Sequence, residues 1–415
     1  MSASAYHLFE VVGLELEYMI VDRESLDVRP IADELIRAEC GRIESEIDCG
    51  AIAWSNELVL HVIELKTRGP ARELAGLDAA FQQNVERIDR HLAPLGARLL
   101  PSGMHPWMDP ERELRLWPHE HSAVYASFDR IFDCRGHGWA NLQSVHINLP
   151  FAGDDEFGRL HAAIRVLLPL LPALSASSPY QAGRATGLFD TRLEHYALNS
   201  RRLPSVAGAV VPEPVFTRRD YEERILAPIY RELAPHDPEG VLRHEWVNAR
   251  GCIARFERSA IEIRVLDVAE SPRVDVAIAD AIVEMLRALV EERVSSGSEQ
   301  RAVETGALAQ LLRGVIRLGP AARTSDAALL RALGWSGAES ASAGALLAGL
   351  FARVRGRLAG GARGAALLDF LLAQGPLAAR LAQVAGPEAS REELLPVYLA
   401  LADCLAQGRV FGAGA

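Results

Sequence analysis

Residues 13–22 read GLELEYMIVD, and the fold is inferred outward from this stretch. Successive residues of a β-strand point to opposite faces, so Glu15 and Glu17 project together from one face. Leu14 and Leu16 project from the other face. The alternation predicts a strand that buries one face in a core and gathers negative charge on the opposite face.

Alternating patterns of this kind dominate the chain up to about residue 270. They predict six strands, at 9–22, 51–67, 97–104, 139–150, 251–258 and 260–267. Between them, apolar residues recur at three- and four-residue spacing and predict helices at 70–93, 155–175 and 219–233. Strands and helices do not alternate regularly, and the first strand is not followed by a glycine-rich fingerprint. The chain is therefore predicted to be α+β rather than a doubly wound parallel fold.

After Val274 the sequence consists almost entirely of helix-forming residues. Glycine- and proline-containing breaks predict five or six short helices packed as a bundle, without strands. They lie at 318–320, 334–337, 360–361, 375–376 and 386–387. We therefore expect two parts, an N-terminal domain at 1–295 and a helical C-terminal region at 296–415 packed on it. The Ala/Leu-rich surface of the second part would allow a homo-oligomer.

Composition excludes several classes of protein. The chain has 44 basic and 55 acidic residues and a formal net charge of −11, and Lys66 is its only lysine. P-loops and Schiff-base sites need a lysine in contexts that this sequence lacks. An acidic chain without a basic run argues against nucleic-acid binding. Five scattered cysteines favour a reducing cytoplasmic location, and the sequence predicts neither a membrane span nor a signal peptide.

The stretch NELVLHVIELKT, residues 56–67, places Glu57 and Glu64 among apolar residues. Their spacing of seven is odd, so on one regular strand they would face opposite sides. Two explanations stay open at this level. Either a bulge intervenes between them, or Glu57 lies in a turn before the strand proper.

Two further strands carry polar residues on one face. In LQSVHINLP, residues 142–150, Ser144, His146 and Asn148 share a face. In the last predicted strand, Glu262 and Arg264 share a face with Leu266.

Carboxylates and one imidazole are thus spread over several strands of one expected sheet. Hard oxygen donors with a single nitrogen suit Mg²⁺ or Mn²⁺ better than zinc. Magnesium held by carboxylates usually serves phosphate chemistry. Without a P-loop, a nucleotide would have to be held by metal ions and by arginines.

Six stretches, taken in order, resemble glutamate-cysteine ligase family 2, the carboxylate-amine ligases of the glutamine-synthetase-like superfamily. They are 13–22, 56–67, 101–107 (PSGMHPW), 142–150, 173–192 and 261–279. The resemblance covers about residues 9–295. It implies a curved antiparallel sheet of about six strands, shaped as a funnel and covered by helices. ATP would enter from one end and the amino-acid substrates from the other.

Site residues follow from the resemblance position by position. It implies that two or three Mg²⁺ ions are held by six ligands, Glu15, Glu17, Glu57, Glu64, His146 and Glu262. Arg264 would face the transferred phosphoryl group, and Glu57 is assigned to the catalytic set as well. Arg192 is the candidate for binding a substrate α-carboxylate, because a guanidinium matches that group in shape and charge. His105 is expected to line the site.

The implied reaction is ATP-dependent formation of a γ-glutamyl amide through an acyl phosphate, of the glutamate-cysteine ligase type that serves glutathione biosynthesis. Its partners would be small molecules, namely ATP, an amino acid and an amine. Residues 193–214 are hard to align with the family pattern, so the same chemistry on another acid and amine stays open. A metal-dependent hydrolase that activates water with the same carboxylates is the alternative from a different class.

Overall fold

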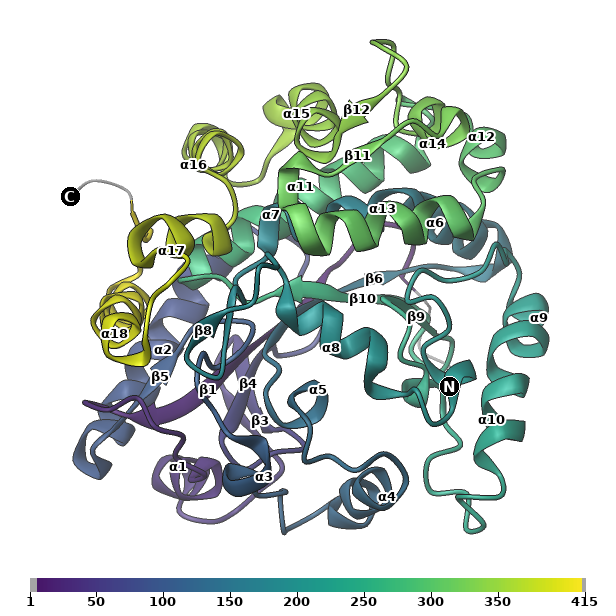
Figure 1. Ribbon diagram of the computed structural model, residues 1–415. Helices are drawn as coiled ribbons and strands as arrows, with labels where there is room; N and C mark the ends of the chain where they lie inside the picture. The colour runs from purple at the N-terminus through teal and green to yellow at the C-terminus, as the bar shows by residue number, and fades with distance from the viewer. Residues whose placement is uncertain (1–5, 413–415) are drawn as a thin grey trace.

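An eight-stranded antiparallel sheet forms the centre of the computed structural model, which describes residues 6–412 (Figure 1). The strand order is β2-β3-β4-β1-β6-β10-β9, and β5 also pairs with β1. The strands are β1 (Gly13–Asp22), β2 (Glu46–Cys49), β3 (Ile52–Asn56), β4 (Val62–Thr67), β5 (Ala97–Leu100), β6 (Ser144–Pro150), β9 (Cys252–Arg255) and β10 (Ala260–Asp267). Strand β1 pairs with β4 along one edge and with β6 and then β5 along the other. The α+β fold class and the antiparallel sheet are confirmed.

The sheet has eight strands rather than about six because the predicted strand 51–67 folds back on itself. Strands β3 and β4 pair with each other, and residues 57–61 form the connection between them. Strand β2 was not predicted and adds an outer strand beside β3. Glu57 therefore lies in the turn that precedes β4, which answers the question raised by its odd spacing from Glu64.

Strand β10 contains a β-bulge. Ile263 lies opposite Ile147 of β6, but the next pair is Leu266 with Val145, so two residues of β10 face one residue of β6. A bulge changes the side to which later residues point. The prediction that Leu266 shares a face with Glu262 is therefore wrong, since Leu266 is buried in the core instead.

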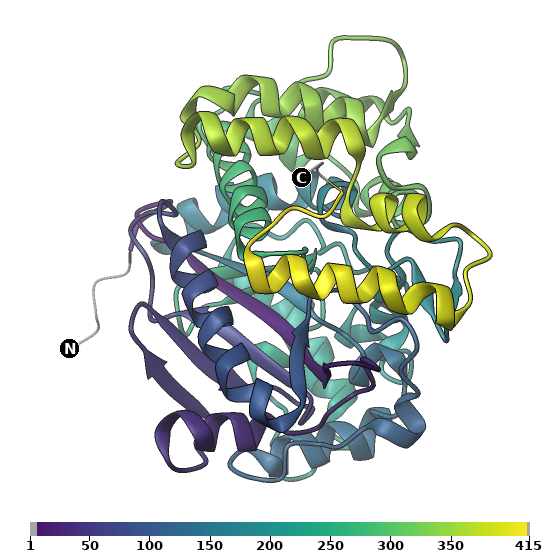
Figure 2. The ribbon, with the colours of Figure 1, turned by 90° about the vertical axis from the view of Figure 1, so that its left-hand side faces the viewer.

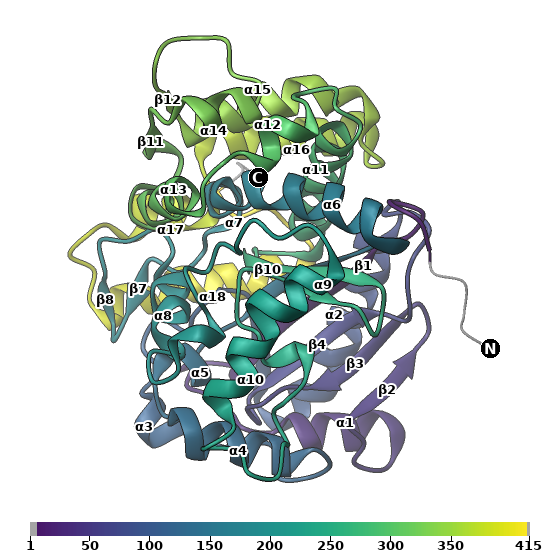
Figure 3. The ribbon, with the colours of Figure 1, turned by 90° about the vertical axis from the view of Figure 1, so that its right-hand side faces the viewer.

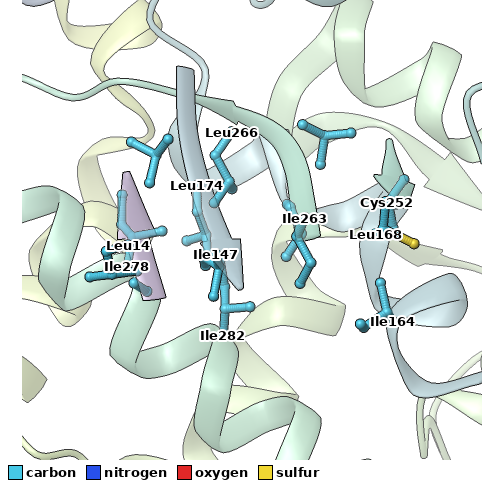
Figure 4. Close-up of a cluster of buried hydrophobic side chains, with 14 of the residues drawn as sticks. Leu14, Ile147, Ile164, Leu168, Leu174, Cys252, Ile263, Leu266, Ile278 and Ile282 are labelled. Carbon is cyan, nitrogen blue, oxygen red and sulfur yellow. The ribbon is translucent and has the colours of Figure 1, made fainter. Parts of the chain in front are cut away.

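One face of the sheet packs on helices and forms the main core. Leu14, Ile147, Ile263 and Leu266 point from β1, β6 and β10 toward Ile278 and other residues of the covering helices (Figure 4). These helices include α2 (Leu77–Leu92), α6 (Gly153–Leu167), α7 (Pro172–Ser175) and α11 (Pro272–Val290). Helices α2 and α7 lie within the helical segments predicted at 70–93 and 155–175, and α6 begins two residues before the second of them. In Figure 2, α2 lies across the strands.

The bulged register of β10 leads to a testable prediction about the stability of the protein. Replacing Leu266 by Ala should destabilise the protein by about 2–5 kcal/mol, because the side chain is 1% exposed and its loss leaves a cavity. The change is measured as the shift of the unfolding midpoint in urea. The control is Leu198→Ala, at a position 50% exposed, which should change stability by less than about 0.5 kcal/mol. A Leu266→Ala variant as stable as this control would contradict the bulged register.

The opposite face of the sheet is partly covered by short helices and loops. They are α3 (Pro110–Glu113), α4 (Ser122–Phe132), α5 (His137–Ala140), α8 (Thr191–Asn199), α9 (Arg218–Tyr221) and α10 (Ala227–Leu233), together with the small β7 (Tyr180–Gln181) and β8 (Arg184–Ala185) pair. Helix α1 (Ala32–Cys40) instead packs against α2, where its Glu39 accepts a hydrogen bond from Arg87 at 2.8 Å. In Figures 1 and 3, α8 and α10 lie on the side of the sheet away from α6 and α11. The helix predicted at 219–233 is present as α9 and α10, joined by a π-helical segment at 222–226.

The C-terminal part is helical, as predicted, but it has more helices than expected and a short two-stranded ribbon. The helices are α12 (Gly297–Arg301), α13 (Thr305–Leu318), α14 (Ala327–Ala332), α15 (Ala343–Val354), α16 (Gly361–Gln374), α17 (Leu377–Ala385) and α18 (Arg391–Gln407). The ribbon pairs β11 (Arg323–Thr324) with β12 (Ala341–Ser342), so the prediction of no strand here is wrong. Its strands are only two residues long, too short for alternation to reveal them.

Helix α18 returns to the sheet and packs beside β5 and α2, as Figure 2 shows. Arg98 of β5 pairs with Asp403 of α18 at 2.5 Å. Within residues 6–412, no single helix is long and apolar enough to cross a bilayer. Only α16 and α17 taken together, with a bend of 51°, have the length and composition for it.

Candidate active site

The sheet face that carries Glu15 and Glu17 borders a cavity of about 710 Å³, which is the size of a typical small-molecule site. The strands contribute Glu64, His146, Glu262 and their neighbours to its floor. Its walls come from α4, α5, α8 and the loop 241–246. A distinct aromatic part of the wall is formed by Tyr125, Phe128, Trp139, His244 and Trp246.

Strand register brings the predicted acidic residues together. Glu17 lies directly opposite Glu64, and Glu15 lies opposite His146. With Glu57 from the turn, these residues form two overlapping groups, Glu15–Glu64–His146 and Glu17–Glu57–Glu64. Within each group, one ligand atom from every residue lies within 4.8 Å of the others. The structure thus gathers five of the six predicted metal ligands.

Neighbouring donors fix these carboxylates. Oε2 of Glu17 accepts hydrogen bonds from the backbone N and the Oγ of Ser144, at 2.6 and 2.9 Å. Glu15 contacts His146 Nδ1 at 2.7 Å and accepts a hydrogen bond from Asn148 at 3.0 Å. Because these donors lie on β6, the strand next to β1, the orientation of both glutamates depends on correct pairing of the two strands.

The cluster carries an excess of negative charge. Burial and the charges of Glu17 and Glu64 raise the pKa of Glu57 well above its usual value. Burial and the charge of Glu15 raise the pKa of Glu64 to about 7. Burial opposes protonation of His146, but its hydrogen bond to Glu15 raises its pKa to about 9. A hard divalent cation would relieve the repulsion between the carboxylates, so this donor set fits Mg²⁺.

Glu262 is placed differently from the other predicted ligands. Its Oε1 accepts a hydrogen bond from Arg264 Nε at 3.0 Å, and its Oε2 lies 3.4 Å from Arg255 Nη1. Burial opposes its ionisation, but the charges of Arg264 and His146 lower its pKa to about 2. Glu262 thus lies between the carboxylate cluster, 3.9 Å from His146, and a group of arginines.

That group consists of Arg255, Arg258 and Arg264, which line the same cavity. Arg264 lies in the bulge of β10, and its carboxylate partner Glu262 is two residues away on the same strand. Carboxylates suit a bound metal ion and guanidinium groups suit phosphate oxygens, so the two groups together fit a metal-bound phosphate ligand. The predicted position of Arg264, facing a phosphoryl group, is compatible with this arrangement.

The two predicted substrate-binding residues have different surroundings. Arg192 lies at the start of α8, lines the cavity and pairs with Asp267. His105 does not line the cavity within the described part of the chain. It is 1% exposed, and its Nε2 lies 2.7 Å from the carbonyl oxygen of Leu26. Burial lowers its pKa to about 4, so it is a neutral core residue that packs against Trp107.

Sequence reasoning missed Asp267 and the aromatic wall. In a regular strand, Asp267 would share the core-facing side of Ile261 and Ile263, and only the bulge turns it to the face of its partner Ser144. The aromatic residues Phe128, Trp139 and Trp246 come from three separate segments, and the ring of Phe128 lies 5.2 Å from that of Trp139 and 5.8 Å from that of Trp246. A sequence pattern without a tertiary structure has no signal that would join them.

Comparison with known proteins agrees with this geometry. The model of the family "Glutamate-cysteine ligase family 2 (GCS2)" matches residues 11–348. An uncharacterized protein of Archaeoglobus fulgidus is 38% identical over 282 residues, which cover 68% of this chain and 75% of that protein. A Rubrobacter xylanophilus protein with the provisional name glutamate–cysteine ligase 2-3 is 29% identical over 46% of this chain. That match spans 49%, about half, of the relative's own length.

Two solved structures share the fold. Glutamate–cysteine ligase of Francisella tularensis, in complex with AMP, has a TM-score of 0.64 at 12% identity. The match covers 99% of this chain and 91% of the Francisella chain. A bifunctional glutathione synthetase of Pasteurella multocida has a TM-score of 0.61 at 15% identity. That match covers 95% of this chain and 53% of the Pasteurella chain. Since the family model matches most of the chain, the protein belongs to glutamate-cysteine ligase family 2 and is a carboxylate-amine ligase.

Proposed function

We propose that the protein is an ATP- and Mg²⁺-dependent ligase that forms a γ-glutamyl amide through an acyl phosphate. The observation that carries the proposal is the buried cluster of Glu15, Glu17, Glu57, Glu64 and His146 beside three cavity-lining arginines. Bound at this cluster, Mg²⁺ would neutralise the phosphate oxygens of ATP. Cysteine is the proposed amine, in keeping with the names of the relatives.

Phosphoryl transfer depends mainly on positioning and charge stabilisation, and the arginines supply both. An oxygen of the acid's side-chain carboxylate attacks the γ-phosphorus, the bond to the bridging oxygen breaks, and ADP leaves. Arg264, with Arg255 and Arg258, stabilises the charge on the transferred phosphoryl oxygens. The amine nitrogen then attacks the acyl carbonyl carbon, inorganic phosphate leaves, and the amine gives up a proton.

Arg192 is proposed to bind the α-carboxylate of the acid. Its guanidinium is buried beside Asp267 at the cavity wall. Glu57 is retained in the catalytic set because its carboxyl is the least restrained of the cluster. Its only hydrogen bond among the described residues comes from the backbone N of Leu58, at 3.3 Å.

We also propose that the enzyme acts in the cytoplasm. All five cysteines, Cys40, Cys49, Cys134, Cys252 and Cys404, are free thiols in the structure. Free thiols persist in a reducing compartment, where the proposed substrate cysteine is also kept reduced.

The proposal is tested by incubating the protein with ATP, Mg²⁺ and glutamate, adding amino acids and amines one at a time, and measuring phosphate release. We expect release to rise with one amine and to require glutamate. The mass of the product should equal that of glutamate plus the amine minus one water, as amide formation requires. Release with a different acid and amine would keep the ligase chemistry and change its substrates. Hydrolysis of an ester or amide without ATP, with no pair stimulating phosphate release, would favour the metal-dependent hydrolase and contradict the proposal.

A further inference from the structure

Arg192 is a buried cation with an unused edge. It is 1% exposed, and the only hydrogen bond of its guanidinium within residues 6–412 joins Nε to Oδ1 of Asp267. Its Nη2 is enclosed and has no hydrogen-bond partner. Nη1 also has no hydrogen-bond partner among the described residues, but it is not enclosed, and Arg192 lines the cavity. A guanidinium this deeply buried needs acceptors for its donors, so Nη1 is the donor that a ligand carboxylate in the cavity would satisfy.

Asp267 is held rigidly around this contact. Its Oδ2 accepts hydrogen bonds from the backbone N of Ser177 and the Oγ of Ser178, each at 2.8 Å. Ser178 Oγ in turn accepts a hydrogen bond from the backbone N of Arg192 at 3.1 Å. Gly103 packs so closely that a Cβ there would lie 2.3 Å from the Asp267 carboxyl carbon. The carboxylate therefore has little freedom to rotate, and it fixes both Arg192 and the start of α8.

The same aspartate ties Arg192 to the acidic cluster through the sheet. Beyond the bulge of β10, Asp267 lies directly opposite Ser144 of β6. Ser144 holds Oε2 of Glu17 through its backbone N and Oγ. One strand pair thus sets the position of the guanidinium relative to the carboxylates that would hold the metal.

We propose that Asp267 is a positioning residue for substrate binding: it holds Arg192 so that the free edge of the guanidinium faces the carboxylate of the acid substrate. The inference rests on the proposed ligase function for the identity of the acid. Asp267 makes no contact with substrate in this arrangement and acts only through Arg192.

A double-mutant cycle tests the proposal, with Asp267→Asn, Arg192→Gln and the double variant. Glutamate binding is measured by calorimetry, and KM for glutamate, KM for ATP and kcat by phosphate release. We expect Asp267→Asn to raise the Kd and KM for glutamate about tenfold or more, with KM for ATP unchanged and kcat within about threefold. In the Arg192→Gln background, the same change should add almost nothing, because Asp267 would have no group left to position.

Asp190→Asn is the matched control. Asp190 is buried in the same region and caps α8 by accepting a hydrogen bond from the backbone N of Leu193 at 2.8 Å, while its Oδ2 has no partner. Asparagine keeps this cap, so glutamate affinity should stay at the wild-type value.

Three results would overturn the proposal: unchanged glutamate affinity in Asp267→Asn, an equal loss in the Arg192→Gln background, or no glutamate binding by the wild type. Glutamate binding without phosphate release would count against the ligase function instead, and the cycle would still be read from Kd. If circular dichroism shows that Asp267→Asn does not fold, Ser178→Ala replaces it. That variant should weaken glutamate binding about two- to fivefold, and again only when Arg192 is present.

Discussion

Glu57→Gln should be almost inactive and yet more stable than the wild type in the absence of metal. Burial and the charges of Glu17 and Glu64 raise the pKa of Glu57 well above its usual value. A carboxyl with a raised pKa in the folded state destabilises the protein, and this loss grows as pH rises above the pKa of the unfolded chain. At pH 8, a neutral glutamine should therefore add about 1–2 kcal/mol to the free energy of unfolding.

The same substitution should remove the response to metal. In the wild type, Mg²⁺ at 100 times its Kd is expected to add about 2.7 kcal/mol of stability, because it binds only the folded state. Glu57→Gln should lose most of this gain, and kcat should fall about 10²- to 10³-fold. Thermal melting in EDTA and in Mg²⁺, together with phosphate release, measures both effects.

Glu73→Gln is the control, because Glu73 is exposed on a loop and does not line the cavity. It should change neither the melting temperature nor kcat. A Glu57→Gln variant that melts below the wild type in EDTA, or that turns over normally, would contradict the proposed cluster.

Arg264→Lys should lower kcat about 10²- to 10³-fold although the positive charge is kept. The Arg264 guanidinium contacts Glu262 through both Nε and Nη2. A lysine ammonium cannot reproduce this planar pair of donors, so the group that faces the phosphoryl oxygens would be misplaced. The loss of a charged hydrogen bond should also cost about 1.5–3 kcal/mol of stability. Steady-state phosphate release and urea unfolding measure the two effects.

Arg90→Lys is the matched change at an exposed position of α2, away from the cavity, and should leave both quantities unchanged. Wild-type kcat in Arg264→Lys would show that Arg264 only neutralises Glu262. The reciprocal variant, Glu262→Gln, is the less informative test, because it would leave Arg264 and Arg255 without their buried counter-charge. Loss of activity there would combine a lost ligand with a destabilised fold.

Much of the site could be predicted from the sequence because a strand has a fixed period. Glu15 and Glu17 share a face of β1, and Ser144 and His146 share a face of β6, whichever strands lie beside them in the sheet. The order of the motifs identified the family, and an acidic chain with a single lysine left magnesium and arginine as the means to bind phosphates. These conclusions depend only on local geometry and residue chemistry, which the sequence contains directly.

Only the tertiary structure decided how the strands are registered and where that periodicity breaks. The turn between β3 and β4 brings Glu57 beside Glu64, and the bulge in β10 buries Leu266 and turns Asp267 toward Arg192. His105 matched a family motif but is enclosed in the core. One extra or missing residue in a strand reverses the face to which all later side chains of that strand point. Which residue forms the bulge depends on the side chains that pairing with a distant strand can bury. That selection is a property of the packed sheet, so the positions of Asp267 and Glu57 are determined only when the strands have assembled.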